Sequence, residues 1–277
     1  MSMLTKPGDR LRSGTGKAVT GGPARAVADA LTRPIVLRLV TAALLLVAWQ
    51  GIGSAVSPTF MSYPTAVVTA AGEELRSGEL LRGLGQSLEA LIVGFIIAVI
   101  AGIVIGLVLG RYTKLRQSVD WLVNALYATP LVAVVPLIIV WMGLGVSAKF
   151  FIVVALAIFP VLINAAAGSQ AVPSEALDLG AAFCGNERQI FWKIIIPSAI
   201  PFIMTGIRLA IGRALIGVVI AEFFTGITGL GAMIQKYGNS IDTAHMLVPV
   251  LTLMLLGVLL SALARLAERK MTPWKKE

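Results

Sequence analysis

The stretch ALIVGFIIAVIAGIVIGLVLG, residues 90–110, decides the fold, because 21 consecutive positions carry no charge. A helix must present about 20 predominantly apolar residues to cross a hydrocarbon core about 30 Å thick. The stretch meets that requirement by itself. It therefore predicts a helix that crosses a membrane.

Small residues recur every four positions within this stretch. They are Gly94, Ala98, Gly102, Gly106 and Gly110. In a helix this spacing puts all of them on one face, where a second backbone can approach closely. Because lipid supplies no hydrophobic drive for helix association, such a face predicts helix–helix packing.

Five further apolar stretches have a similar length. They are residues 39–56, 119–145 (interrupted by Pro130 and Pro136), 150–168 (containing Pro160), 200–220 and 247–263. The chain has 57% hydrophobic residues, 13% charged residues and a mean hydropathy of +0.88, which is more apolar than a soluble core requires. We expect an all-α, polytopic membrane protein with six transmembrane helices.

The 23 Lys and Arg residues orient these helices. If the N-terminus lies inside, 17 of them fall on the inner side, four fall on the outer side, and Arg208 and Arg213 fall within a span. Basic residues accumulate on the cytoplasmic side of a membrane, so both termini are predicted to be cytoplasmic. The net charge of +9 is spread between apolar runs, which does not indicate a nucleic-acid partner.

These assignments divide the chain into four parts. We expect a disordered cytoplasmic tail at residues 1–33, a first transmembrane helix at 34–56, a membrane core at 57–268 and a cytoplasmic tail at 269–277. The first tail is polar and rich in Gly and Ser, with no periodicity.

Two outer segments are too long to be simple connections. Residues 57–89 predict an amphipathic helix near Ala66–Leu81, after two turns that contain proline. Residues 222–246 carry three glycines ahead of a short helix predicted at Ala232–Tyr237.

Four polar residues at membrane depth are candidates for lining a translocation pathway. They are Asn124, Arg208, Arg213 and Glu222. A charge exposed to lipid costs about 2.5–3.5 kcal/mol on insertion scales, so it must face protein or water. The alternatives are a structural ion pair with an acid such as Glu222, snorkelling of Arg208 to the inner interface, and a hydrogen bond between helices for Asn124.

Residues suited to covalent chemistry are scarce. Cys184 and His245 are the single Cys and His, and the G-x-x-x-x-G-K-[ST], H-E-x-x-H and G-x-S-x-G motifs are missing from the sequence. We predict no catalytic residue, no metal site and no ATP hydrolysis by this chain. An ion-coupled carrier or channel is the alternative, but it would need acids within the spans. A membrane enzyme would need paired carboxylates or a nucleophile at membrane depth.

The inner segment SQAVPSEALDLGAAFCGNERQIFWKIIIP, residues 169–197, is a third long and patterned connection. It contains a helix-compatible core from Ser174 to Lys193 and is bounded by Pro173 and Pro197. A helical segment projecting into the cytoplasm predicts docking of a soluble partner. The alternative is a solvated amphipathic loop.

This segment resembles the cytoplasmic "EAA" loop of permeases of ATP-binding-cassette importers, E-A-A-x(3)-G-x(9)-I-x-L-P. Alignment on residues 194–197 puts the motif's glycine at Cys184 and its glutamate at Asp178, with Leu179 and Gly180 at the alanines. The glycine is therefore lost and the acid is shortened. Residues 77–110 and 197–223 closely resemble the subgroup that imports nitrate, taurine and alkanesulfonates, and the likeness covers residues 60–268.

The resemblance implies the fold of a type I importer permease in a bacterial inner membrane. It implies a second permease copy, an ATPase subunit that binds ATP and Mg²⁺, and a solute-binding protein that delivers a small solute, for which the two arginines are compatible with an anion. Coupling to the ATPase would fall to seven residues of the inner loop. They are Glu175, Asp178, Gly180, Cys184, Gly185, Arg188 and Pro197.

Overall fold

The computed structural model describes residues 34–57, 60–226 and 228–271, and within these ranges it consists of helices and turns, without strands. The expected tail at residues 1–33 lies outside the described residues. The chain separates into two compact units, residues 1–51 and 52–277.

Helix α2 (Pro34–Ala55) is the described part of the first unit and runs across its boundary. Its 22 residues give a length of about 33 Å, and its apolar side chains are exposed, with Leu44 at 64% and Val47 at 69%. An exposed apolar helix of this length is suited to lipid.

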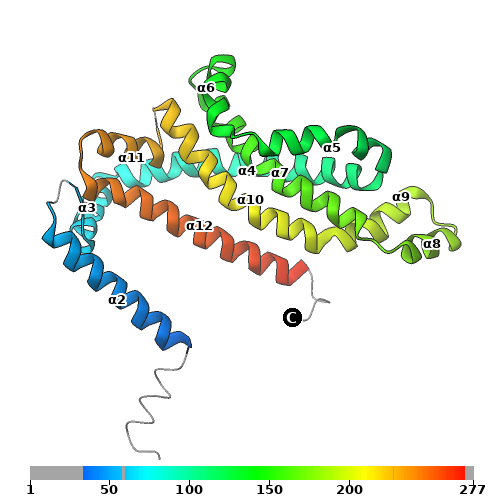
Figure 1. The fold of residues 1–277 in the computed structure, drawn as a ribbon, viewed down its shortest axis with the longest axis horizontal. Coiled ribbons are helices and arrows are strands. Elements are labelled where there is room, and N and C mark those ends of the chain that lie inside the picture. Colours follow the sequence, from blue (N-terminus) through cyan, green and yellow to red (C-terminus); the bar gives the residue numbers. More distant parts are fainter. Residues whose placement is uncertain (1–33, 58–59, 227, 272–277) are drawn as a thin grey trace, which may run out of the picture. The chain divides into compact units, whose positions relative to one another are not determined.

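The second unit holds the remaining helices, shown in chain order in Figure 1. They are α3 (Pro64–Ser77), α4 (Glu79–Arg111), α5 (Thr113–Ala128), α6 (Leu131–Met142), α7 (Val146–Gln170), α8 (Ser174–Ala182), α9 (Glu187–Ile190), the π-helical turn η1 (Phe191–Ile195), α10 (Ile196–Thr225), α11 (Leu230–Asn239) and α12 (Thr243–Met271).

The core of this unit is a three-helix layer in which α7 packs against both α4 and α10. The side chains at the centre are small or β-branched, and Ala98, Val153 and Ala214 are each fully buried. Helix α12 lies along α10 and α11 (Figure 1).

The small-residue face of α4 lies against α7. A Cβ atom added at Gly94 would be 2.7 Å from Cβ of Val153, and one at Gly102 would be 2.8 Å from Cβ of Val161. Ala98 and Gly106 are buried on the same face. At Gly110 an added Cβ would be 2.5 Å from the Cβ of Ser169. The two backbones are therefore too close for larger side chains at these positions.

Five helices of the described residues are long and apolar enough to cross a membrane, and a sixth candidate is the bent pair α5–α6. The interrupted span predicted over residues 119–145 corresponds to this bent pair, in which α5 and α6 meet at 96°. Thr129 is extended, with φ −65° and ψ 129°, as expected for a residue before proline. Pro136 and Pro160, in contrast, lie inside α6 and α7.

Several boundaries also differ from the sequence predictions. Helix α3 ends at Ser77, and α4 begins at Glu79 after the single residue Gly78, which is left-handed with φ +77°. Helix α11 is longer than the predicted segment at 232–237, and α12 continues to Met271, so residues 269–271 are helical.

Candidate functional site

Helix α8, in the segment 169–197, ends in a tight cap. The Cys184 N–H donates to the Ala181 carbonyl at 2.9 Å, and the Gly185 N–H donates to the Gly180 carbonyl at 3.0 Å. This pair of bonds is the pattern of a Schellman motif, which needs a left-handed residue at its turn. Cys184 fills that position with φ +53°. Glycine adopts this conformation without steric cost, which explains why a glycine suits this place in the EAA pattern.

The loop forms two helices, α8 and α9, within the helix-compatible core predicted over residues 174–193. The Schellman turn separates α8 from α9, and Asn186 then starts α9. The Asn186 side chain accepts from the Gln189 N–H at 2.8 Å, while the Gln189 side chain accepts from the Asn186 N–H at 2.9 Å. This reciprocal capping box fixes the new helix start.

The two halves of the loop pack together and continue into the membrane. A Cβ atom at Gly180 would be 2.8 Å from Cδ1 of Ile194, so α8 lies close against η1. Pro197 occupies the first turn of α10, and α9, η1 and α10 form one helical run from Glu187 to Thr225. The loop is therefore continuous with a helix that is long and apolar enough to cross a membrane.

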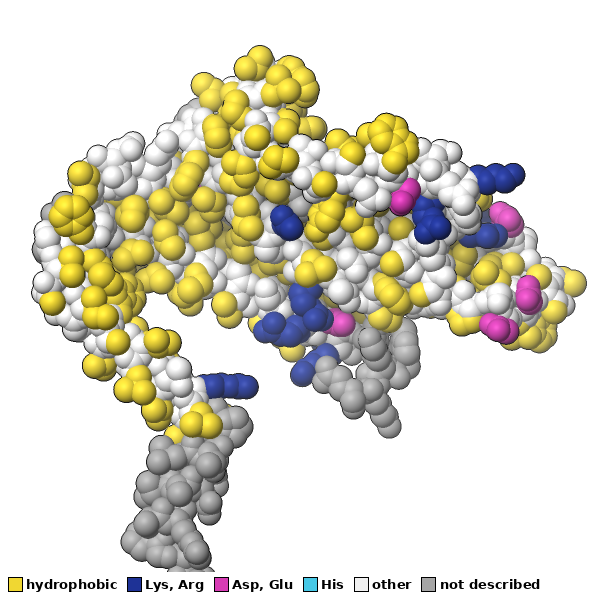
Figure 2. Space-filling model, in the orientation of Figure 1, with side chains coloured by type: hydrophobic (Ala, Val, Ile, Leu, Met, Phe, Trp, Pro, Cys, Tyr) yellow, Lys and Arg dark blue, Asp and Glu magenta, His cyan; other side chains and the backbone are white. Residues whose placement is uncertain are grey.

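The outer surface of α8 and α9 combines acids with exposed apolar side chains. Glu175, Asp178 and Arg188 are exposed, and Leu179 and Phe183 are exposed to 59% and 79%. Figure 2 shows acidic and hydrophobic side chains gathered at this end of the molecule. An exposed aromatic residue with charges around it is typical of a protein–protein interface.

Arg208 and Arg213 of α10 have different surroundings. Arg208 forms an ion pair with Glu268 of α12, which matches the structural alternative. Arg213 is exposed, and its guanidinium lies 5.9 Å from the centre of the Tyr127 ring of α5. Asn124 lies one turn before Tyr127 on α5 and donates to the Asp120 carbonyl of its own helix at 2.8 Å.

Glu222 is fully buried near the C-terminal end of α10 and joins three helices. Its carboxylate accepts from the Ser87 hydroxyl of α4 at 2.8 and 2.9 Å and from the Gly231 N–H of α11 at 2.7 Å. The Ser87 oxygen in turn accepts from the Leu230 N–H at 2.8 Å. Gly229 has φ +105°, and a Cβ atom there would overlap the Glu222 carboxylate.

The basic group that acts electrostatically on Glu222 is Lys149. The sequence prediction put Lys149 in an outer loop, but it is buried in the first turn of α7. Its ammonium donates to the carbonyl and the hydroxyl of Thr228, at 2.8 Å each. The acid and the base therefore both hold the 228–231 segment in place.

A second charged cluster joins α3, α4, α11 and α12. His245 lies 3.3 Å from Glu73 and 2.9 Å from Asp242, and Lys236 lies 3.0 Å from Glu79. At its centre Glu74 is 2% exposed, and in the described part of the chain neither of its oxygens has a hydrogen-bond partner. The burial of Glu74 could not be predicted from the sequence, because in an amphipathic helix a glutamate is expected on the exposed face.

Burial, partly offset by His245, raises the pKa of Glu74 from 4.5 to about 7. Between these values the folded chain keeps a proton that the unfolded chain has lost, so stability falls as pH rises through this window and is constant above it. We expect Glu74→Gln to remove this fall, which amounts to at most about 3 kcal/mol. Melting temperatures in detergent between pH 5 and 8 would measure it, and the exposed Glu175 of α8, changed to Gln, should keep the fall.

Known proteins resemble this chain over most of its length. Residues 98–273 match the family described as "Binding-protein-dependent transport system inner membrane component". The taurine transport system permease protein TauC of Escherichia coli (strain K12) is 29% identical over 255 residues, which are 89% of this chain and 92% of TauC. The riboflavin transport system permease protein RibX of Chloroflexus aurantiacus is 35% identical over 238 residues, which are 85% of this chain and 89% of RibX.

The fold also resembles a solved chain. A chain from an inward-facing structure of the MetNI methionine ABC transporter superposes with a TM-score of 0.63 at 19% identity, covering 72% of this chain and 99% of that chain. At this identity the likeness concerns the fold.

Proposed function

Because the chain belongs to the family of binding-protein-dependent transport system inner membrane components, we propose that two copies of it form the translocation pathway of an ATP-driven importer. Each copy docks one ATPase subunit on the cytoplasmic side, and that subunit binds ATP and Mg²⁺. A solute-binding protein delivers the solute at the outer face, and both chain termini are cytoplasmic. Taurine and riboflavin in the names of relatives support a small organic solute.

The observation that carries this proposal is the exposed surface of α8 and α9. Helix α9 begins a continuous helical run that ends at Thr225. A short helix held by the Schellman turn and by Gly180 moves as a rigid body. Closure of two ATPase subunits would then pull α8 and tilt α10 without a flexible linker between them.

Phe183→Asp tests the docking surface. Loss of a central aromatic anchor costs about 2 kcal/mol or more, roughly 30-fold in affinity, so we expect co-purification of the ATPase subunit and solute uptake to be lost from native membranes. Phe60 on the outer side is 82% exposed, close to the 79% of Phe183, and Phe60→Asp should leave the ATPase bound. Equal ATPase retention in both variants would contradict docking at α8–α9.

Arg213 is our candidate for contacting the solute. It is exposed at membrane depth, and its neighbour Tyr127 faces it from α5. Because a cation in lipid is costly, this face is expected to line a water-filled pathway between the two copies. An anionic group on the solute would pair with the guanidinium.

Arg213→Gln should therefore lower uptake while leaving assembly and ATP hydrolysis intact. A hydrogen bond to a charged group contributes about 1.5–3 kcal/mol, so we expect a loss of roughly 10- to 100-fold in uptake at low solute concentration. Arg213→Lys, which keeps the charge, should retain part of the uptake. Normal uptake by the Gln variant would exclude this role.

A further inference from the structure

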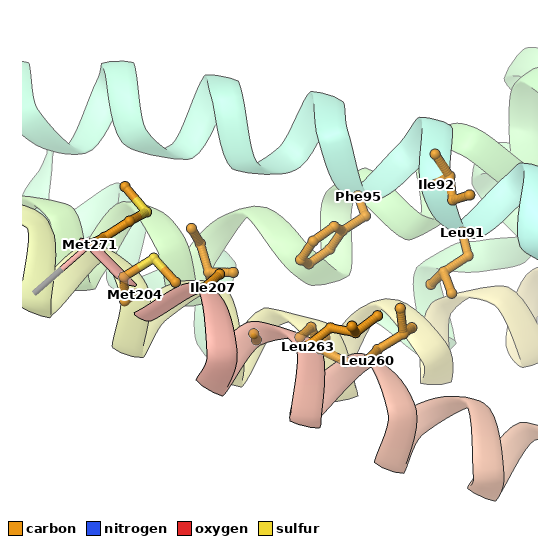
Figure 3. Close-up of a pocket in the computed structure, with 11 residues that line it drawn as sticks. Leu91, Ile92, Phe95, Met204, Ile207, Leu260, Leu263 and Met271 are labelled. Atoms are coloured by element: carbon orange, nitrogen blue, oxygen red, sulfur yellow. The ribbon is translucent and has the colours of Figure 1, made fainter. Parts of the chain in front are cut away.

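A groove lined entirely by apolar side chains lies between α4, α10 and α12, with a cavity volume of about 400 Å³. Figure 3 shows Leu91, Ile92 and Phe95 at one end of it, and Met204 and Met271 at the other. No polar side chain lines the groove, so it offers nothing to orient a polar solute.

The groove follows the last three turns of α12. On α12 its lining extends from Leu260 to Met271, which is about 16 Å along the helix. On α4 the lining residues Leu91 and Phe95 lie near the middle of the 33-residue helix. The groove thus ends at the C-terminus of α12, which is at the inner interface given a cytoplasmic end for α12.

Its side is open in the single chain. Ile92 is 45% exposed, Leu263 is 51% exposed and Met271 is 48% exposed. The small side chains of Ala264 and Ala267 form part of the lining on α12. A slender apolar chain can therefore enter from the side, parallel to the helices.

One cation, Lys270, lies near the end of the groove at the C-terminus of α12. Lys270 follows the lining residue Ala267 by three positions and so lies on the same side of α12. Among the described residues Lys270 has no ion-pair partner, whereas Glu268 on the other flank is paired with Arg208. Arg269, two positions after Ala267, points away from this side.

We propose that this groove binds one phospholipid of the inner leaflet with an anionic headgroup. An acyl chain fills the apolar groove up to Phe95, and the phosphate lies at Lys270. Anionic headgroups are attracted to basic residues at the cytoplasmic ends of transmembrane helices. The apolar lining of the groove and the cation at its end, unpaired in the described part of the chain, favour an anionic lipid over a protein segment.

The test measures lipid binding by the full-length protein and does not depend on transport. The protein is purified in mild detergent, and bound dioleoyl phosphatidylglycerol and dioleoyl phosphatidylcholine are compared by native mass spectrometry. We expect one retained phosphatidylglycerol per chain. Lys270→Gln should reduce the preference for phosphatidylglycerol about fivefold, and Arg269→Gln should leave it unchanged.

Filling the groove tests the acyl-chain part of the proposal. Ala267→Phe should abolish retention of the lipid, while Leu266→Phe, at the adjacent exposed position outside the lining, should keep it. Equal retention in both variants, or an equal effect of the Lys270 and Arg269 substitutions, would overturn the proposal. So would a wild-type protein that retains no phospholipid.

A photo-crosslinking residue at Leu263 identifies the occupant in native membranes and does not require a groove-filling variant to fold. A phospholipid adduct supports the proposal. An adduct to α2 or to a second copy of the chain in place of lipid overturns it, because a helix would then occupy the groove.

Discussion

Gly106→Leu is expected to prevent the membrane core from assembling. A Cβ atom at Gly106 would overlap the Leu162 carbonyl oxygen and lie 2.7 Å from Cβ of Ala165. Since a backbone carbonyl within α7 cannot rotate away, α4 and α7 must separate along their contact. Overpacking of a core costs about 1–3 kcal/mol when side chains can adjust, and here we expect about 3 kcal/mol or more. The melting temperature in detergent and the monodisperse fraction on size exclusion would both report it.

The matched control lies on the same helix. Gly85 of α4 has no atom within 4 Å of an added Cβ, so Gly85→Leu should be neutral or slightly stabilising, because Gly costs about 1 kcal/mol relative to good helix formers. A well-folded Gly106→Leu protein would show that α4 and α7 can repack, and it would contradict the close-contact interpretation of the small-residue face.

The spans could be predicted from sequence because lipid sets one strong requirement, a run of about 20 apolar residues. The small-residue face could be predicted as well, because residues four positions apart lie on the same face of a helix. Both signals are local, and the structure places Gly94 and Gly102 against α7.

The bend between α5 and α6 could not be predicted with the same rule. Pro130 ends a helix, whereas Pro136 and Pro160 lie inside α6 and α7. The three prolines look alike in an apolar run. Only tertiary packing decides whether the chain keeps its helix with one hydrogen bond missing or turns by 96°.

The buried contacts of Glu222 and Lys149 could not be predicted from the sequence for a different reason. Ser87 is 135 residues from Glu222, and Lys149 is 79 residues from Thr228. No local pattern reports such distant pairs. The available signal was an intramembrane acid followed by Gly229 and Gly231, because a carboxylate next to two glycines can reach backbone N–H groups directly.

Glu222→Ala is expected to destabilise the protein strongly. The substitution leaves the Gly231 N–H and the Ser87 hydroxyl without their buried acceptor, and it leaves Lys149 without the carboxylate that acts on it. Removing one member of a buried charged network costs about 3–5 kcal/mol, which should appear as a large fall in melting temperature.

Two comparisons test whether the destabilisation comes from the buried contacts of Glu222 or would follow the removal of any carboxylate. Glu175 is an exposed carboxylate on α8, so Glu175→Ala should change stability by at most about 0.5 kcal/mol. Adding Lys149→Met to Glu222→Ala should recover part of the loss, because an uncompensated buried cation is then removed. If the double variant is less stable than Glu222→Ala by the full cost of Lys149→Met alone, the two charges are independent. Glu222 would then act only as a hydrogen-bond acceptor for the 229–231 segment.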